Sequence, residues 1–456
     1  MTYERLLTSF LLPAYDRARG RCYVERRTFL DGSQWWSHER VLDFQWSALK
    51  ALLAHAFTSV PYLARKYRAA GIGLEDVRGW TDIHRLPPLT RAEVNAHGAE
   101  LCSTAYTGRL LPHATGGSTG APTRFFRTYE SYDWRTAAKD RAYSWAGWRA
   151  GQRALYLWGA PVGTVTKRQR WKTRLHEAAQ RQLVVNTFSQ DDQLWDDVYA
   201  RARRFRPTLI VGYVSSLEAF AASLHGTGRA LPSLTAAIAA AEPLFETTRR
   251  QIEAALGVPV FNTYGSREFM SIAAECECRD GLHIHAENLL VETQEAADSG
   301  SSEILITDLH NYGMPFVRYA IGDVGMVTNE SCACGRGLPL LRRLEGRVLD
   351  SLRTADGRTV PGEFFPHLLK EVPELAHYRV EQQAIDRLVI SAVLTAPLSE
   401  PSAALVRREV ARVFGPHTSC EVRRVARIAP LPSGKRRVTV GLGGSSMEHD
   451  RWSSRT

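Results

Sequence analysis

Apolar side chains recur at helical spacing through the first hundred or so residues. The run QWSALKALLAHAFTSVPYLARKYRAAG (45–71) repeats apolar positions every three or four residues and stops at Gly71, which predicts helix. Pro87 and Pro88 then impose an extended piece. Thr90, followed three residues later by Glu93, has the spacing of a helix-capping box. Residues 1 to about 110 are therefore predicted to be mainly helical.

From Tyr129 onward, amphipathic helices alternate with short apolar runs. The pattern predicts helices at 130–151, 215–226 and 247–257, and buried strands at 153–159, 208–213, 234–245 and 258–266. Strands that alternate with helices form a parallel sheet, and such a sheet binds its ligand at the carboxyl ends of the strands.

The remaining segments differ from this alternation. Three strand-like runs, 282–294, 302–309 and 316–328, look antiparallel, and the last hundred residues hold short strands at 378–382, 387–394 and 420–425 with one helix at 401–415. We therefore predict an α/β fold in three parts. Residues 1–344 form a large domain with parallel sheets and an antiparallel section, 345–440 form a small mobile α+β domain, and 441–456 form a disordered tail.

Composition fits a globular protein with a sizeable core, since 44% of the 456 residues are hydrophobic and 23% are charged. No apolar run approaches the roughly 18 residues that cross a bilayer. The N-terminal stretch MTYERLLTSFLLPAYDRARGR reads as an amphipathic helix rather than a signal peptide, which predicts a cytoplasmic protein. The net charge of +10 suits anionic partners. The basic run 166–174 is either a solvated helix face or a surface for a phosphate or a partner.

Four of the seven cysteines form two Cys-x-Cys pairs, Cys276/Cys278 and Cys332/Cys334. Paired cysteines in a chain without an export signal favour a metal site over disulfides. One cysteine of the first pair, both of the second and His283 would make a closed Cys3His site of the kind that binds structural zinc. Cys278 competes with Cys276, His285 competes with His283, and reduced thiols without metal remain the alternative.

The stretch HATGGSTGAPTRFF (113–126) is rich in glycine and hydroxyl side chains. Glycine lets a backbone come close to a polyphosphate, although a plain linker has the same composition and the Gly-Lys-Ser/Thr ending of the common P-loop is missing. Five further motifs follow in a fixed order: AAEPLF (240–245), YGSRE (264–268), RYAIGD (318–323), GRVLD (346–350) and LPSGKRR (431–437).

This ordered set resembles the adenylate-forming superfamily of acyl-CoA synthetases, adenylation domains and luciferases. More narrowly it resembles the phenylacetate–CoA ligase family and, within it, the capsular-polysaccharide-type branch. The narrower resemblance rests on SVPYLARKYRAAGI (59–72), LPPLTRAEV (86–94), the paired cysteines and DGRTV (356–360), and the whole covers roughly residues 50 to 440. It implies a two-step reaction, in which an acid attacks the α-phosphate of ATP and a thiol or amine then displaces AMP.

The resemblance also assigns roles to matching residues. The β- and γ-phosphates of ATP would be held by Thr115, Gly116, Gly117, Ser118, Thr119 and Gly120. The YGSRE motif would supply Tyr264 to stack on adenine, Gly265, Ser266 to face the α-phosphate or the acyl group, and Glu268 to bind magnesium. Glu242 and Pro243 would lie beside the adenine, Asp323 would accept hydrogen bonds from both ribose hydroxyls, and Arg343 would reach the ribose or a phosphate. Lys435 would be the catalytic lysine that bridges the attacking carboxylate and the α-phosphate.

Three further assignments follow from the resemblance. The family spacing favours Cys276 as metal ligand with His283, Cys332 and Cys334. Aromatic side chains that match the acid pocket are Tyr143, Trp145, Trp148, Trp158 and Tyr213, which suit a flat aromatic acid but are equally typical of a core. At the interdomain hinge, where the family has two aspartates, this chain has Leu349 and Asp350, which puts a standard second half-reaction in doubt.

The sequence thus predicts an ATP- and magnesium-dependent ligase that activates a small, aromatic or other carboxylic acid and passes it to coenzyme A or to a carrier protein. Transfer to an amine, or activation of an oxyacid such as nitrite, stays open because of Leu349. A non-catalytic zinc protein that binds nucleic acid is the remote alternative. In the favoured interpretation neither nucleic acid nor membrane is a partner, and a homodimer remains open. The Arg- and Ala-rich composition is compatible with a role in bacterial secondary metabolism.

Overall fold

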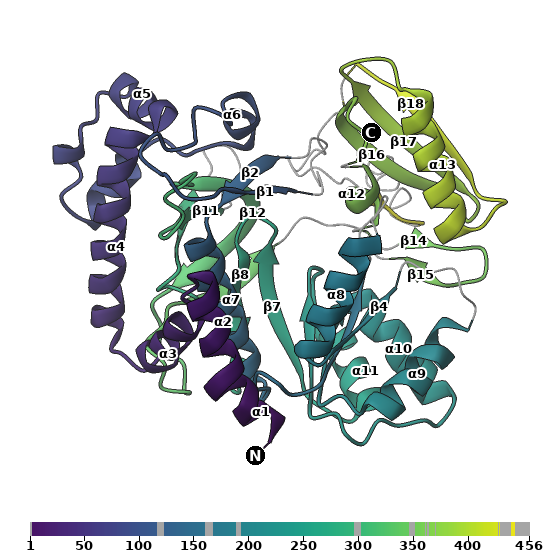
Figure 1. The fold of residues 1–456 in the computed structure, drawn as a ribbon. Coiled ribbons are helices and arrows are strands. Elements are labelled where there is room, and N and C mark those ends of the chain that lie inside the picture. Colours follow the sequence, from purple (N-terminus) through teal and green to yellow (C-terminus); the bar gives the residue numbers. More distant parts are fainter. Residues whose placement is uncertain are drawn as a thin grey trace, which may run out of the picture. The chain divides into compact units, whose positions relative to one another are not determined.

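The computed structural model (Figure 1) describes residues 2–115, 123–159, 167–187, 193–295, 302–345, 352–360, 362, 364–369, 371–426, 428 and 439–442. The chain divides into two compact units. Unit 1 comprises Met1–Ala114, Thr123–Gly151 and Phe261–Gly346, and unit 2 comprises Thr115–Pro122, Gln152–Val260 and Arg347–Thr456. The predicted domain boundary at residue 344 stays a prediction.

Unit 1 is built on an antiparallel sheet, which confirms the antiparallel section expected from the sequence. Its strands lie in the order β10-β11-β12-β13-β9-β8-β7. Their bounds are β7 Val260–Ser266, β8 Met270–Glu275, β9 Leu282–Ile284, β10 Leu289–Glu295, β11 Ser302–Asp308, β12 Tyr319–Thr328 and β13 Leu340–Glu345. A separate antiparallel pair, β1 Leu111–Ala114 and β2 Arg124–Arg127, flanks the glycine-rich stretch.

The helices of unit 1 come mostly from the N-terminal third, as predicted. They are α1 Tyr3–Leu6, the π-helical turn η1 Leu7–Leu11, α2 Leu12–Arg19, α3 Tyr23–Ser33, α4 His38–Ser59, α5 Pro61–Ala69, the 3₁₀ turns η2 Leu74–Asp76 and η3 Trp80–Arg85, α6 Arg91–Ala96 and α7 Tyr129–Trp145. The expected helix up to Gly71 is two helices. Val60 is extended (φ −114°, ψ 99°), because the ring of Pro61 disfavours helical geometry in the residue before it.

The segment before α6 runs beside β12. The Leu89 amide donates to the Arg318 carbonyl (3.0 Å), and the Ala320 amide donates to the Leu89 carbonyl (2.9 Å). The predicted capping box is present, since the Thr90 hydroxyl accepts from the Glu93 amide and the Glu93 carboxylate accepts from the Thr90 amide. These contacts fix the start of α6 beside the start of β12.

Unit 2 contains the predicted parallel α/β layer. Its strands lie in the order β6-β5-β3-β4, and every neighbouring pair is parallel. The elements are β3 Ala154–Trp158, α8 Lys167–Ala179, β4 Gln182–Asn186, α9 Leu194–Phe205, β5 Leu209–Tyr213, α10 Val214–Gly226, β6 Ala236–Ala240 and α11 Glu246–Leu256. The sequence analysis did not assign β4, an edge strand that is only partly buried and whose apolar run is just three residues long.

The C-terminal part of unit 2 is the smaller α+β section expected from the sequence. Its four-stranded sheet has the order β18-β17-β16-β19, and α13 lies against it (Figure 1). The elements are β14 Leu352–Arg353, β15 Thr359–Val360, α12 Phe364–Leu369, β16 Leu375–Ala384, β17 Arg387–Leu394, α13 Glu400–Phe414, β18 Ser419–Arg424 and β19 Thr439–Val440. Among the described helices, none combines the length and the apolarity that a bilayer crossing requires.

Candidate functional site

Tyr264 and Asp323 lie side by side in unit 1. Tyr264 is on β7 and Asp323 is on β12, and the tyrosine hydroxyl donates to Asp323 Oδ2 at 2.8 Å. Gly265 follows at a point where the β7–β8 register shifts, and a Cβ there would lie 2.0 Å from the Met270 carbonyl oxygen. Only glycine fits at that position. Two residues that the sequence predicted for adenine and ribose are therefore brought together.

Glu268 lies beyond the end of β7, and its carboxylate is almost fully buried. Its Oε1 is 3.3 Å from the Arg91 guanidinium and 3.4 Å from the Tyr319 hydroxyl. Burial by itself would lower the pKa of Arg91, but Tyr319 and Glu268 together raise that pKa above its ordinary value. The sequence analysis missed Arg91. Arg91 directly follows the capping Thr90 in a segment that resembles the family. That position in the sequence does not reveal a contact with a residue 177 positions away.

Ser266 and the backbone around Glu268 form a tight turn. The Phe269 amide donates to Ser266 Oγ at 3.2 Å. Met270, immediately after this turn, and Arg318, immediately before Tyr319, have positive φ values of 67° and 49°. Such geometry is strained for a residue with a side chain, and it clusters at functional sites.

In unit 2, Glu242 follows β6 and is held by Ser215, whose amide (2.7 Å) and hydroxyl (3.0 Å) both donate to its carboxylate. Burial is the main cause that raises the pKa of Glu242, to about 7. The preceding Ala241 has a φ of 65°. Pro243 is exposed. The AAEPLF motif thus presents a partly neutral carboxyl at the carboxyl end of a parallel strand.

Several predicted residues lie outside the described part of the chain. They are Gly116, Gly117, Ser118, Thr119, Gly120, Leu349, Asp350 and Lys435, together with the side chain of Arg343. Thr115, which opens the glycine-rich motif, is described and buried. The roles of these residues stay predictions.

The five aromatic residues predicted for the acid pocket fall into separate groups. In unit 2 the rings of Trp158 and Tyr213 stack at 4.4 Å, and Tyr213 belongs to an apolar cluster with C-terminal residues such as Phe364. In unit 1 the rings of Tyr143 and Trp148 meet edge to face at 5.9 Å. Trp145 instead lies 5.6 Å from each of the His283 and His285 rings.

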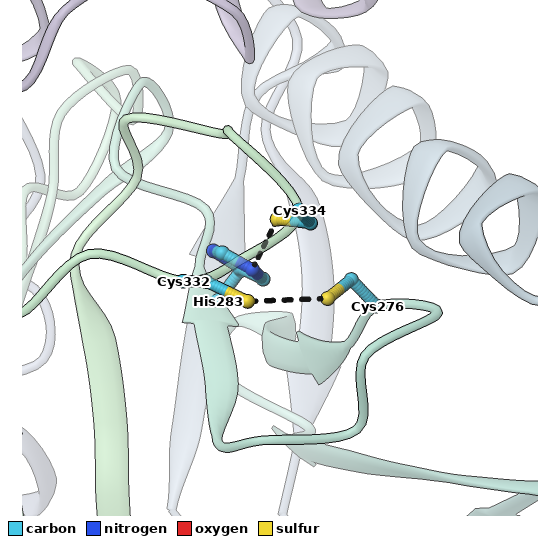
Figure 2. Close-up of side chains that lie close together, drawn as sticks. All are labelled: Cys276, His283, Cys332 and Cys334. Atoms are coloured by element: carbon cyan, nitrogen blue, oxygen red, sulfur yellow. Dashed lines mark hydrogen bonds between the residues drawn. The ribbon is translucent and has the colours of Figure 1, made fainter.

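The clearest convergence of side chains in the described residues is a cluster of three cysteines and one histidine (Figure 2). The ligand atoms of Cys276, His283, Cys332 and Cys334 all lie within 4.8 Å of one another. Cys276 Sγ is 3.7 Å from Cys332 Sγ, and Cys334 Sγ is 3.3 Å from His283 Nε2. A tetrahedral zinc with Zn–S bonds of about 2.3 Å separates its sulfur ligands by roughly 3.8 Å. The donor set and its spacing therefore fit zinc.

Two turns and one strand position this cluster. The Cys276 carbonyl accepts from the Arg279 amide, and the Cys332 carbonyl accepts from the Gly335 amide, so each cysteine pair starts a tight turn. Arg279 and Gly335 take the left-handed conformation that each turn needs. His283 lies on β9, opposite Ala274 of β8 on one side and Leu340 of β13 on the other.

The competing ligands lie elsewhere. Cys278 is exposed on its turn. His285 is buried, with Nε2 at 3.0 Å from the Ser271 hydroxyl and Nδ1 at 3.2 Å from the Arg141 guanidinium. Burial lowers the pKa of His283 to about 4, which keeps a ring lone pair free at neutral pH. Burial raises the pKa of Cys276, whereas hydrogen bonds from Arg336 hold the pKa of Cys334 below its usual range despite burial.

Comparison with known proteins places this geometry in context. No family model matches the chain. It is 27% identical over 387 residues to the phenylacetate–coenzyme A ligase of Thermus thermophilus, which covers 82% of this chain and 84% of the relative. It is 24% identical to the Escherichia coli phenylacetate–coenzyme A ligase, covering 78% of this chain and 82% of the relative. It is 22% identical to the Staphylococcus aureus protein CapK, and the match covers 79% of this chain and 80% of the relative.

Solved structures agree on the fold. The structure of 2-hydroxyisobutyryl-CoA ligase in complex with 2-HIB-AMP and CoA matches with a TM-score of 0.59 at 19% identity, over 91% of this chain and 92% of that chain. A second structure of the ligase, in the postadenylation state, matches with a TM-score of 0.56 at 17% identity, over 92% and 93%. Over most of its length the chain is thus similar in sequence to proteins named phenylacetate–coenzyme A ligase and CapK, and it shares the fold of 2-hydroxyisobutyryl-CoA ligase.

Proposed function

We propose that the protein is an AMP-forming acid–thiol ligase. It activates a small carboxylic acid with ATP and transfers the acyl group to a thiol. The observation that carries this proposal is the hydrogen-bonded pair of Tyr264 and Asp323 beside the buried carboxylate of Glu268. Relatives named phenylacetate–coenzyme A ligase that span most of this chain support it.

In the first half-reaction, a carboxylate oxygen of the acid attacks the α-phosphorus of ATP. A new P–O bond forms, the bond to the β-phosphate breaks, and pyrophosphate leaves. Tyr264 would stack on adenine, and Asp323 would accept hydrogen bonds from the ribose hydroxyls while it holds Tyr264 in place. Thr115 and residues 116–120 would surround the β- and γ-phosphates. Lys435 would stabilise the charge that develops between the carboxylate and the α-phosphate.

Glu268 would hold magnesium. Its oxygens are the hard ligands that Mg²⁺ prefers, and the Arg91 guanidinium, 3.3 Å from the carboxylate, already places one positive charge beside it. When bound, the ion would offset the negative charge of the phosphates. Ser266, on the preceding turn, would face the α-phosphate or the acyl group.

In the second half-reaction, a thiol sulfur attacks the acyl carbon and a C–S bond forms. The bond from the acyl carbon to the phosphate oxygen breaks, AMP leaves, and the thiol proton passes to solvent. We propose coenzyme A as acceptor, with the thiol arm of a carrier protein as the alternative. An amine acceptor is a second alternative, because Leu349 replaces the aspartate that the family has at the hinge. For the acid, the stacked rings of Trp158 and Tyr213 support an aromatic substrate.

The Cys/His cluster would hold a structural zinc. All four ligand positions are filled by protein atoms, so no position stays open for a reacting molecule. The zinc would therefore stabilise the fold of unit 1 and take no part in the transfer.

The overall reaction tests this proposal. Purified protein is incubated with ATP, magnesium, coenzyme A and a panel of aryl, heteroaryl and aliphatic acids, and AMP and the acyl thioester are measured by mass spectrometry. We expect equal amounts of AMP and thioester with one class of acid. AMP formed together with an amide or a carrier thioester, but no coenzyme A thioester, would reassign the acceptor. The absence of AMP with every acid would reject the ligase.

A further inference from the structure

The turn between α3 and α4 lies against the loop that carries Cys332 and Cys334. The Gly337 amide donates to the Gln34 carbonyl (3.3 Å), and His38 Nδ1 lies 3.3 Å from the Gly337 carbonyl oxygen. A Cβ at Gly337 would lie only 2.1 Å from the Trp36 carbonyl oxygen. The two backbones are therefore in direct contact, and only glycine permits it.

The Gln34 side chain sits at the centre of this contact and is 7% exposed. Its Oε1 accepts from Trp145 Nε1 at 2.8 Å and from Arg336 Nε at 3.0 Å, and its Nε2 donates to the Asp31 carbonyl at 2.9 Å. An amide oxygen has two lone pairs, and both are used here. Gln34 thereby connects α3, α7 and the loop that carries Cys332 and Cys334.

Both donors to Gln34 also contact the cluster. The Trp145 ring lies 5.6 Å from the ring of His283, and the Arg336 amide donates to Cys334 Sγ at 3.5 Å. The Arg336 guanidinium also pairs with Glu277, which lies between the two cysteines of the first turn, at 2.8 Å. Gln34 is thus linked to two of the four metal-binding side chains through one intervening residue each, to His283 through Trp145 and to Cys334 through Arg336.

We propose that Gln34 couples the Cys/His centre to the N-terminal helices, so that a bound metal holds the α3–α4 turn against the sheet. This inference rests on the metal site proposed above. Zn²⁺ with three thiolates carries one net negative charge, and Arg336 is a buried cation whose amide donates to one of the thiolates. Attraction to that charge fixes Arg336, and Arg336 fixes the oxygen of Gln34. Without metal the cysteine turns lose their cross-link, and Arg336 keeps Glu277 but loses the charged centre as a partner, so its hydrogen bond to Gln34 weakens.

Amide hydrogen exchange of the full-length protein tests the coupling, with and without a zinc chelator, and zinc content is measured in parallel. The reporters are the Trp36 amide, which donates to the Ser33 carbonyl, and the Gly337 amide. In the wild type, removal of zinc is expected to speed exchange at both by about tenfold, the effect of one lost hydrogen bond to a charged group. In Gln34→Ala, exchange should be fast with zinc bound, and the chelator should change it less than about twofold.

Two further variants separate coupling from general loosening. Gln45 is equally buried and ties α4 to the sheet through the Leu289 carbonyl, but it has no contact with the cluster in the described residues. Gln45→Ala should raise exchange in α4 and keep the wild-type response to the chelator. Gln34→Glu loses the donor to the Asp31 carbonyl but keeps the oxygen that accepts from Trp145 and Arg336, and it should restore that response.

Three results would overturn the inference. One is unchanged exchange in the wild type after complete removal of zinc, and another is a wild-type chelator response in Gln34→Ala. The third is a protein that binds no zinc when purified or after addition of the metal. That last result would leave the ligase proposal untouched, because the ligase is tested by AMP formation.

Discussion

The Arg91 guanidinium and the Glu268 carboxylate form an ion pair at 3.3 Å, with side chains only 16% and 4% exposed. The pair joins the start of α6 to the turn after β7, two segments that are far apart in the sequence. Removal of one partner from such a pair leaves an uncompensated buried charge.

Arg91→Gln is therefore expected to lower the free energy of unfolding by about 3 kcal/mol, because the Glu268 carboxylate would remain buried without its cation. Urea denaturation measures the change. Arg65, whose pair with Glu100 is 53% and 43% exposed, provides the control, and Arg65→Gln should cost less than about 1 kcal/mol. Equal losses in the free energy of unfolding for the two variants would mean that the buried pair stabilises the fold no more than the exposed pair does.

Tyr264→Phe is expected to raise the KM for ATP about fivefold to tenfold and to change the melting temperature little. The variant keeps the ring but loses the hydroxyl that donates to Asp323, so the aspartate is no longer held for the ribose. Initial rates at varied ATP measure the effect. Tyr15→Phe, at an exposed position, is the control. An unchanged KM for ATP in Tyr264→Phe would remove this pair from the nucleotide site.

The half-buried carboxyl of Glu242 predicts a pH dependence of stability. Its folded-state pKa of about 7 lies above the ordinary value of 4.5, so the folded chain binds this proton more tightly than the unfolded chain. The stability that this proton contributes is complete below about pH 4.5 and is lost as the pH rises through about 7. Relative to Glu242→Gln, the wild type should lose about 1–3 kcal/mol between pH 5 and 8.

Urea denaturation of both proteins across that pH range measures this loss. Glu246 on α11 supplies an exposed carboxylate for comparison, and Glu246→Gln should follow the wild-type curve. A constant difference between the wild type and Glu242→Gln at all pH values would contradict the raised pKa.

Cys276→Ser and Cys278→Ser form a matched pair for the metal site, because both cysteines lie on one turn and only Cys276 faces the cluster. Cys276→Ser should lower bound zinc from about one ion per chain to a small fraction and lower the melting temperature, since metal binding contributes directly to folding. Cys278→Ser should keep both. Metal analysis and thermal unfolding measure these quantities. Full zinc content in Cys276→Ser would contradict the assignment.

Local spacing in the sequence was enough for many elements of the fold. The capping box at Thr90 and Glu93, the apolar runs of β5 and β6 and the helix α13 all depend on neighbours within a few residues. The same holds for the two Cys-x-Cys pairs, because each pair starts a tight turn formed by neighbouring residues. Pro61 shows where apolar spacing alone fails as a guide. The helical spacing of apolar residues continues through Val60, although the helix ends there and a new one begins at Pro61.

Contacts between distant segments could not be predicted in this way. Arg91 reads as an ordinary helix residue, and its role depends on the contact of residues 89–91 with β12. Trp145 matched an aromatic acid pocket by its position in a helix, a role that stays a prediction. Its ring lies 5.6 Å from each of the His283 and His285 rings, a contact that helical spacing does not reveal. Gln34 gave no sequence signal, since its partners are 111 and 302 residues away.

ATP–pyrophosphate exchange tests the central claim most directly, because it reports formation of an acyl-adenylate without any acceptor. The assay uses the zinc-loaded protein, a panel of acids, and the variants Glu268→Gln and Lys435→Ala. We expect exchange that depends on one class of acid and falls by about 10²–10³-fold in each variant, measured at a temperature at which circular dichroism shows each variant folded. No exchange with any acid, or wild-type exchange in both variants, would contradict the account.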